Sequence, residues 1–318
     1  MLLELPKDFT QKLHDTFSTA ASNGDVIFAG DTAERTIETQ KVGLSSVDVE
    51  TTLLKLLAKR PQKGSVDKNP FANPEPELTI VDPYGPNDQF RLVLNKFPTL
   101  AEHFMMITRE FKSQDTPLDL DELVGTYSVL SKLYEDDEDR EWFAFYNCGP
   151  ESGASQPHKH VQFMTLPKSR KFTAWPAKLS KKLEAFRPND RKEPLNDPEL
   201  PFAHFVAKLP EKSVIELDPE ELSFYFISLL QRVLTVLKEH EKNVPSYNFV
   251  LTTEYMMLVP RLNGKVGTIG LNTCGYMGLV LCKNQEDVNY SSEKGLCWLL
   301  EQGGFPNEAQ EHSVDFAY

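Results

Sequence analysis

The amino-acid sequence predicts an α+β protein built around an antiparallel sheet. Apolar residues recur with the helical period over residues 118–134, while the short hydrophobic segments on either side have the character of strands. Because the helical period is confined to one segment, the order strand, strand, helix, strand, strand favours an antiparallel sheet. A likeness between residues 102–109 and 254–261 further suggests two divergent copies of one sheet motif.

The first predicted element is a helix over residues 8–20, where Phe9, Leu13 and Phe17 have helical spacing. Residues 60–78 are rich in Pro, Lys and Asn and are expected to form an irregular surface loop. Strands are expected at residues 90–95, 103–108, 142–146, 160–164 and 247–251. The acidic run 136–139 is predicted to be a solvated turn that ends the central helix. A polar, proline-bearing connection over 186–201 leads to a second helix, at 218–241.

Composition and charge exclude several classes of function. The chain has 318 residues, 40% of them hydrophobic, and a net charge of −13. A general binder of nucleic acid or of an anionic membrane needs a basic face, so neither partner is expected. The N-terminus has no long apolar stretch, which argues against a secretory signal. A polyphosphate ligand would need positive charge gathered locally, against the field of the whole protein.

The densest polar motif follows a loop of small residues, 149–155. His158, His160 and Gln162 alternate along a predicted strand and therefore point to one face. Small residues let backbone N–H groups approach an anion closely. Neutral imidazole is a competent nucleophile near pH 7, and the amide of Gln162 can donate to a phosphate oxygen. His160 is thus a candidate nucleophile for phosphoryl chemistry, with its second ring nitrogen donating to a carbonyl.

Two other interpretations of the motif stay open. Two histidines on one face often bind zinc, and a third ligand could come from His204, Cys148 or Glu151. The histidines could also be a structural pair in a polar cleft. No C-x-x-C pair is formed by Cys148, Cys274, Cys282 and Cys297, so a cysteine-based zinc site is not expected.

Several segments spread from about residue 50 to the C-terminus resemble a known family. Besides the H-x-H-x-Q row within residues 153–162, they are residues 94–98, 145–147, 202–206, 246–248, 259–261, 275–276 and 303–307. The chain resembles the fungal diadenosine tetraphosphate phosphorylases, or ATP adenylyltransferases. These belong to the galactose-1-phosphate uridylyltransferase branch of the histidine-triad superfamily, in which Gln162 stands where the hydrolases have a third histidine.

The resemblance implies one histidine-triad-like catalytic domain over residues 1–318, with a first half at about 45–170 and a second half at about 200–315. It also implies a two-step reaction. His160 attacks an α-phosphorus of diadenosine tetraphosphate, ATP leaves, and inorganic phosphate converts the histidine-bound AMP to ADP. The reverse reaction makes the dinucleotide from ATP and ADP, and adenylylsulfate is a further possible substrate.

The resemblance assigns substrate-binding roles to a set of residues, with His160 as the nucleophile. The set consists of Lys59 or Arg60, Asn95, Lys96, Asn147, Gly153, Ala154, Ser155, Gln156, Gln162, Asn272, Thr273, Cys274, Leu279 and Lys283. Two positions depart from the family pattern. Cys274 replaces a hydroxyl residue, and Arg60 offers a planar fork where a point charge is expected. His103 is interpreted as structural, and His204 matches the family without a clear role. His14, His240 and His312 are expected at the surface.

No tightly bound metal is expected; a divalent cation, Mg²⁺ by its chemistry, would arrive with the polyphosphate. The expected partners are small molecules alone, namely diadenosine tetraphosphate, ATP, ADP, AMP and phosphate. A monomer in the cytoplasm is expected, with the nucleus left open as a second location. Two alternatives remain: a hexose-1-phosphate uridylyltransferase, and a dinucleotide-binding sensor without catalysis.

Overall fold

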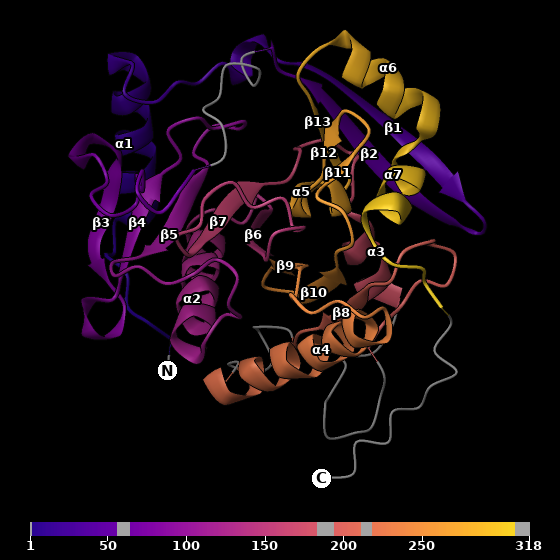
Figure 1. Ribbon diagram of the computed structural model, residues 1–318. Coiled ribbons are helices and arrows are strands. Elements are labelled where there is room, and N and C mark those ends of the chain that lie inside the picture. Colours follow the sequence, from indigo (N-terminus) through magenta and orange to yellow (C-terminus); the bar gives the residue numbers. More distant parts are fainter. Residues whose placement is uncertain (1, 56–63, 183–193, 211–217, 309–318) are drawn as a thin grey trace.

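The structure is a computed structural model that describes residues 2–55, 64–182, 194–210 and 218–308. Its main feature is an antiparallel sheet of eight strands (Figure 1). In sheet order the strands are β3 (Thr79–Tyr84), β4 (Phe90–Leu94), β5 (Phe104–Thr108), β7 (His160–Thr165), β6 (Trp142–Cys148), β9 (Tyr247–Leu251), β10 (Tyr255–Pro260) and β8 (Phe205–Lys208). The predicted α+β class and antiparallel sheet are confirmed.

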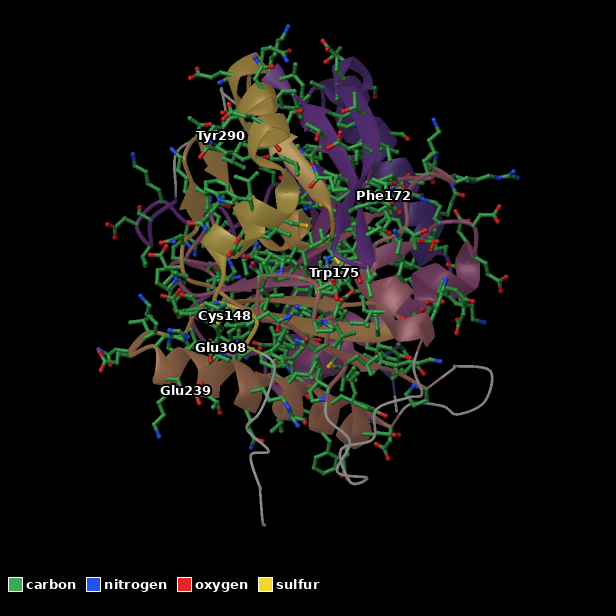
Figure 2. All side chains as sticks on the ribbon, turned by 90° about the vertical axis from the view of Figure 1, so that its right-hand side faces the viewer. Cys148, Phe172, Trp175, Glu239, Tyr290 and Glu308 are labelled. Atoms are coloured by element: carbon green, nitrogen blue, oxygen red, sulfur yellow. The ribbon has the colours of Figure 1, made fainter. Side chains whose placement is uncertain are left out.

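The sheet is the middle of three layers (Figure 1). One face is covered by α1 (Phe9–Asn23), α2 (Leu120–Asp136) and α4 (Pro219–Glu239), whose apolar residues form one core with it. Over the other face lies a smaller sheet of β1 (Glu34–Val42), β2 (Ser45–Leu53) and β13 (Leu279–Cys282). With it are the hairpin β11 (Lys265–Val266) and β12 (Ile269–Gly270), and the helices α3 (Trp175–Lys182), α5 (Thr273–Tyr276), α6 (Gln285–Lys294) and α7 (Leu296–Gly303). Figure 2 shows Glu239 of α4 and Tyr290 of α6 on opposite sides, with Cys148 of β6 between them.

The large sheet contains the same unit twice. β5, α2, β6 and β7 are followed along the chain by β8, α4, β9 and β10, and the two units meet where β6 pairs with β9. By sheet position β8 therefore corresponds to β5, and β10 to β7. The predicted two-part architecture is thus present, but the likeness noted between residues 102–109 and 254–261 joins β5 to β10, which are not counterparts.

The strand registers give the correct correspondence. Ile107 opposes His160 in the first unit, and Lys208 opposes Tyr255 in the second. Met105 opposes Gln162, whereas Val206 opposes Met257. Tyr255 and Met257 thus stand where the first unit has His160 and Gln162. Only the first unit therefore carries the polar row formed by His158, His160 and Gln162. His103 and His204, each one residue ahead of its strand, are counterparts as well.

The alternation of β7 separates the two faces of the sheet, as the sequence predicts. Lys159, just before the strand, points toward the helices, where its ammonium lies 2.7 Å from a carboxylate oxygen of Glu122 in α2. Both side chains are buried, so this lysine is a structural partner of α2 and not part of the polar row. His160 and Gln162 point to the opposite face.

The predicted helices at 8–20, 118–134 and 218–241 and the predicted strands are all present as α1, α2, α4, β4, β5, β6, β7 and β9. Sequence patterning missed β1, because this strand is largely exposed and polar and carries no apolar repeat. It also missed the neighbouring strand β2, which is largely buried. Of the predicted connection 186–201, residues 186–193 lie outside the described residues, and 194–201 contain neither helix nor strand. Within the described part of the chain, no helix combines the length and apolarity that a membrane span requires.

Candidate active site

His160 begins β7, and its ring is buried with 3% of the residue exposed. Its Nδ1 lies 2.8 Å from the carbonyl oxygen of His158. Because a carbonyl can only accept, Nδ1 carries the proton and Nε2 keeps the lone pair. Loss of hydration on burial lowers the pKa of His160 to about 4, so the ring is neutral at pH 7. The carbonyl acceptor expected for the second nitrogen is therefore the main chain of His158.

Hydrogen bonds occupy both ring nitrogens of His158. Nε2 lies 2.8 Å from the Thr108 carbonyl and donates to it, so Nδ1 accepts from the amide of Asn69 at 2.8 Å. No lone pair is left for a metal. His204, a suggested third zinc ligand, is likewise engaged, because Nδ1 donates to the Phe202 carbonyl and Nε2 accepts from the Asp197 N–H. The described residues contain no group of three His, Cys, Asp or Glu suited to a metal.

Gln114 fixes the start of β7, and sequence reasoning missed it. Its side-chain oxygen accepts from the backbone N–H of His160 at 2.8 Å, and its amide nitrogen donates to the Asn147 carbonyl at 2.8 Å. The side chain is fully buried and bridges the ends of β6 and β7. There the two strands diverge around the loop of small residues 149–155, hereafter the glycine loop. A single glutamine in a loop, 46 residues from its partner, gives no sequence signal of this role.

The loop of small residues packs directly on the segment before α5. Gly153 has φ of +83°, and a Cβ there would meet the Leu271 carbonyl oxygen at 2.4 Å, so glycine is required for both reasons. Asn147 links the two segments, because its Oδ1 accepts from the N–H of Thr273 at 3.1 Å and from its hydroxyl at 2.7 Å. Thr273 is fully buried, donates to Asn147 and is not among the residues that line the cavities described below.

Arg261 is buried beneath these segments and donates almost entirely to carbonyls. Nε donates to Gly303 at 3.0 Å, Nη1 to Ser152 at 3.3 Å, and Nη2 to Leu271 at 3.2 Å. Nη1 also donates to Oδ1 of Asn248, whose amide in turn donates to Oδ1 of Asn147 at 2.8 Å. The guanidinium therefore ties the glycine loop to the 271–273 segment from below.

Two cavities meet above β7. The smaller, of about 300 Å³, is lined by Pro70, Phe71, Asn73, Pro74, Glu75, Leu78, Val93, Leu94, Asn95, Lys96, Phe97, Met105, Ser155, Gln156, His160 and Gln162. The larger, of about 730 Å³, extends between the two sheets. Its lining includes Glu50, Thr52, His103, Phe145 and Asn147, and residues 269–272, 274, 275, 279–281 and 283. Asn95, Ser155 and Gln162 line both cavities. A ligand that spans the two would pass Gln162 beside His160.

Most of the predicted binding residues line these cavities. Gln156 and Lys96 line the smaller one, while Asn147, Gly153, Ala154, Asn272, Cys274, Leu279 and Lys283 line the larger one. Lys96 also forms an ion pair with Glu75, at 2.5 Å, and is half exposed. Cys274 lies on the wall of the larger cavity. Lys59 and Arg60 lie outside the described residues.

The loop predicted as irregular surface contributes to the site. Phe71 covers the row of histidines, with its ring centroid 5.1 Å from that of His160 and 5.9 Å from that of His158. The Gly64 N–H donates to the Ser155 carbonyl at 2.9 Å, which fastens this loop to the glycine loop. The described part of the loop is irregular and mostly exposed, as predicted. Its role over the cavity was not predicted, because a proline-rich, polar segment has no periodic pattern that reveals such a role.

The other histidines are placed as follows. His14 is exposed and pairs with Glu102, and the exposed His240 contacts Phe305 in a tilted arrangement, with ring centroids 4.8 Å apart. His312 lies outside the described residues. His103 was interpreted as structural, yet it lines the larger cavity and its Nε2 lies 3.1 Å from Oε1 of Gln162.

Comparison with known proteins identifies this arrangement. The Ap4A phosphorylase N-terminal domain matches residues 2–182, and the ATP adenylyltransferase C-terminal domain matches residues 198–306. The chain belongs to the Ap4A phosphorylase family. It is 34% identical to diadenosine 5′,5′′′-P1,P4-tetraphosphate phosphorylase 2 of Saccharomyces cerevisiae, over 99% of this chain and 100% of the relative.

Solved structures of the family agree with the fold. The yeast Ap4A phosphorylase Apa2 in complex with AMP superposes with a TM-score of 0.85 at 33% identity, over 97% of this chain and 100% of that one. Its complex with Ap4A gives a TM-score of 0.84 at 34% identity, with the same coverage. The family resemblance predicted from the sequence is confirmed.

Two buried histidines of this Ap4A phosphorylase family member predict a pH dependence of stability. Burial lowers the pKa of both His160 and His204 to about 4, from the ordinary value of 6.5. Between these values the unfolded chain binds protons that the folded chain does not, so stability is complete above pH 6.5 and falls as the pH falls toward 4. Each histidine should lower the free energy of unfolding by about 2 kcal/mol at pH 5 relative to pH 7.

Urea unfolding at the two pH values measures this loss, and His204→Asn should remove about half of it. An equal loss in the variant and the parent protein would contradict the assignment.

Proposed function

We propose that this protein is a diadenosine tetraphosphate phosphorylase that also works in reverse as an ATP adenylyltransferase. Membership of the family supports the reaction class. The observation that carries the proposal is the junction of two cavities at Gln162, beside a neutral imidazole whose free nitrogen is Nε2. A dinucleotide joined by a polyphosphate needs two such compartments with the reacting phosphorus between them.

In the first step, Nε2 of His160 attacks an α-phosphorus of diadenosine tetraphosphate. A P–N bond forms while the bond from that phosphorus to the bridging oxygen breaks, and ATP leaves with the electron pair. The imidazole becomes positively charged without any proton transfer, and its Nδ1–H continues to donate to the His158 carbonyl. The Gln162 amide and the backbone of residues 153–155 take up the charge on the phosphoryl oxygens.

In the second step, inorganic phosphate attacks the same phosphorus. The P–N bond breaks, ADP forms, and His160 returns to its neutral state. The low pKa of the buried ring favours this return, because the leaving imidazole is stable in its neutral form at pH 7, with its one proton on Nδ1. Sulfate in place of phosphate would correspond to the exchange with adenylylsulfate.

The cavities differ in a way that suits the two ends of the substrate. The smaller one is walled by apolar side chains, among them Phe71, Val93 and Met105, and suits a purine base. The larger one has room for the second nucleoside and the leaving phosphates, with Lys283 as a source of positive charge. A divalent cation would enter on the polyphosphate and reduce its repulsion by a protein of net charge −13. We propose a monomeric, cytoplasmic enzyme.

A product assay across dinucleoside polyphosphates, with and without phosphate, tests the function. We expect ATP and ADP from diadenosine tetraphosphate only when phosphate is present. AMP and ATP formed without phosphate would indicate a hydrolase. Turnover of a uridine diphosphate sugar with a hexose phosphate would favour the uridylyltransferase alternative. Binding of diadenosine tetraphosphate with no release of ATP under any condition would favour the remaining alternative, a dinucleotide-binding sensor without catalysis.

A further inference from the structure

We infer that His103 is a positioning residue that orients the amide of Gln162 for the reaction. The inference rests on the proposed adenylyl transfer and deepens it. A glutamine amide has a donor end and an acceptor end, and only the donor end can stabilise the negative oxygens of a phosphoryl group. Some other group must therefore hold the acceptor end away from the phosphorus.

His103 is placed to do this by the strand register. Met105 opposes Gln162 across β5 and β7, and His103 lies two residues earlier on the same face. That makes it the diagonal neighbour of Gln162, within reach of a long side chain. The contact is between Nε2 of His103 and the side-chain oxygen of Gln162, at 3.1 Å. His103 is buried, with 4% of the residue exposed, so water competes weakly for this bond.

Asn95 lies beside the same ring. The backbone N–H of Asn95 donates to the His103 carbonyl at 2.9 Å, which brings the two residues side by side at the ends of β4 and β5. Oδ1 of Asn95 accepts from the Phe97 N–H at 3.0 Å, so its amide nitrogen faces the ring, 3.5 Å from both Nδ1 and Nε2. The shorter contact, from Nε2 to the Gln162 oxygen, decides the tautomer, because an amide oxygen can only accept and Nε2 must therefore carry the hydrogen.

The consequence for Gln162 is direct. With its oxygen accepting from His103, its NH₂ group is turned toward the junction of the two cavities, where His160 lies. In the reversed orientation a carbonyl oxygen would face the phosphoryl oxygens and repel them. The second unit of the sheet gives an internal comparison. There His204 stands in place of His103, Met257 in place of Gln162, and His204 instead accepts from the Asp197 N–H.

The test uses a matched pair of variants. In His103→Gln the side-chain amide can still donate to Gln162, whereas in His103→Met a side chain of similar shape cannot. The rate of adenylyl transfer to His160, measured by release of ATP in a single turnover, should fall about 100-fold in His103→Met and less than about 5-fold in His103→Gln. The Kd for diadenosine tetraphosphate should change less than about 3-fold in either, because the bond matters most when charge develops on the phosphorus. Equal rates in the two variants would overturn the inference.

Two further measurements separate positioning from a structural role. The wild-type protein should prefer one diastereomer of a substrate carrying sulfur at the α-phosphorus, and the preference should collapse in both His103→Met and Gln162→Ala. In the double variant His103→Met/Gln162→Ala, the rate should equal that of Gln162→Ala alone. Additive losses would show that His103 acts independently of Gln162 and would refute the inference. If the wild-type protein released no ATP at all, the proposed function would fail instead.

Discussion

Replacing His160 by asparagine should lower kcat/KM for phosphorolysis of diadenosine tetraphosphate by at least about 10⁴-fold, on the order seen when an enzyme loses its nucleophile. Asparagine keeps a polar group near the His158 carbonyl but has no lone pair able to form the P–N bond. Substrate binding should be nearly unchanged, since the cavities on both sides of the residue remain. Initial rates with saturating phosphate, together with an equilibrium binding measurement, check both statements.

The covalent step is tested separately by trapping. Incubation with dinucleotide labelled at the α-phosphorus, without phosphate, should leave label on the wild-type protein in an acid-labile adduct and none on His160→Asn. His204→Asn is a matched control, because His204 is equally buried and also donates from Nδ1 to the carbonyl two residues before it. The control should still form the adduct. Full turnover by His160→Asn, or label retained on it, would rule out the proposed intermediate.

The site was predictable where it depends on local sequence. The placement of His160 and Gln162 on one face beside a cavity follows from a period-two row on a strand, and the close-packed loop at 153–155 follows from a run of small residues before it. A bond from the second ring nitrogen to a carbonyl was also expected, and the structure supplies it from His158, only two residues away. Such features depend on spacing along one segment, which the sequence displays directly.

The unpredicted features depend on distant segments that happen to meet. Gln114 reaches His160 from a loop before α2, Phe71 covers the histidines from a proline-rich loop, and Arg261 supports the glycine loop from the second unit. None of these contacts follows from a periodic pattern. The internal repeat shows the same limit, since composition linked residues 102–109 to 254–261, whereas sheet position links His103 to His204. Apolar strands resemble one another by composition, and only pairing determines which are equivalent.

Replacing Arg261 by methionine should have the largest effect on stability. The side chain is 1% exposed and donates to the carbonyls of Ser152, Leu271 and Gly303. Methionine fills most of the volume but donates to none of them, and each buried acceptor left without a partner costs about 1 kcal/mol or more. The variant should lose about 4 kcal/mol of unfolding free energy in total, which corresponds to a melting temperature lower by roughly 8 °C.

Activity should fall with stability in this variant, because the same guanidinium holds the glycine loop against the 271–273 segment and reaches Asn147 through Asn248. Arg232→Met is the control, since Arg232 is only half buried and its Nη1 bonds are to Ser228 of its own helix. It should change the free energy of unfolding by less than about 1 kcal/mol. Urea unfolding and kcat/KM at a temperature where both variants are folded give the two measurements. A fully active Arg261→Met would mean that the glycine loop holds its shape without support from the second unit.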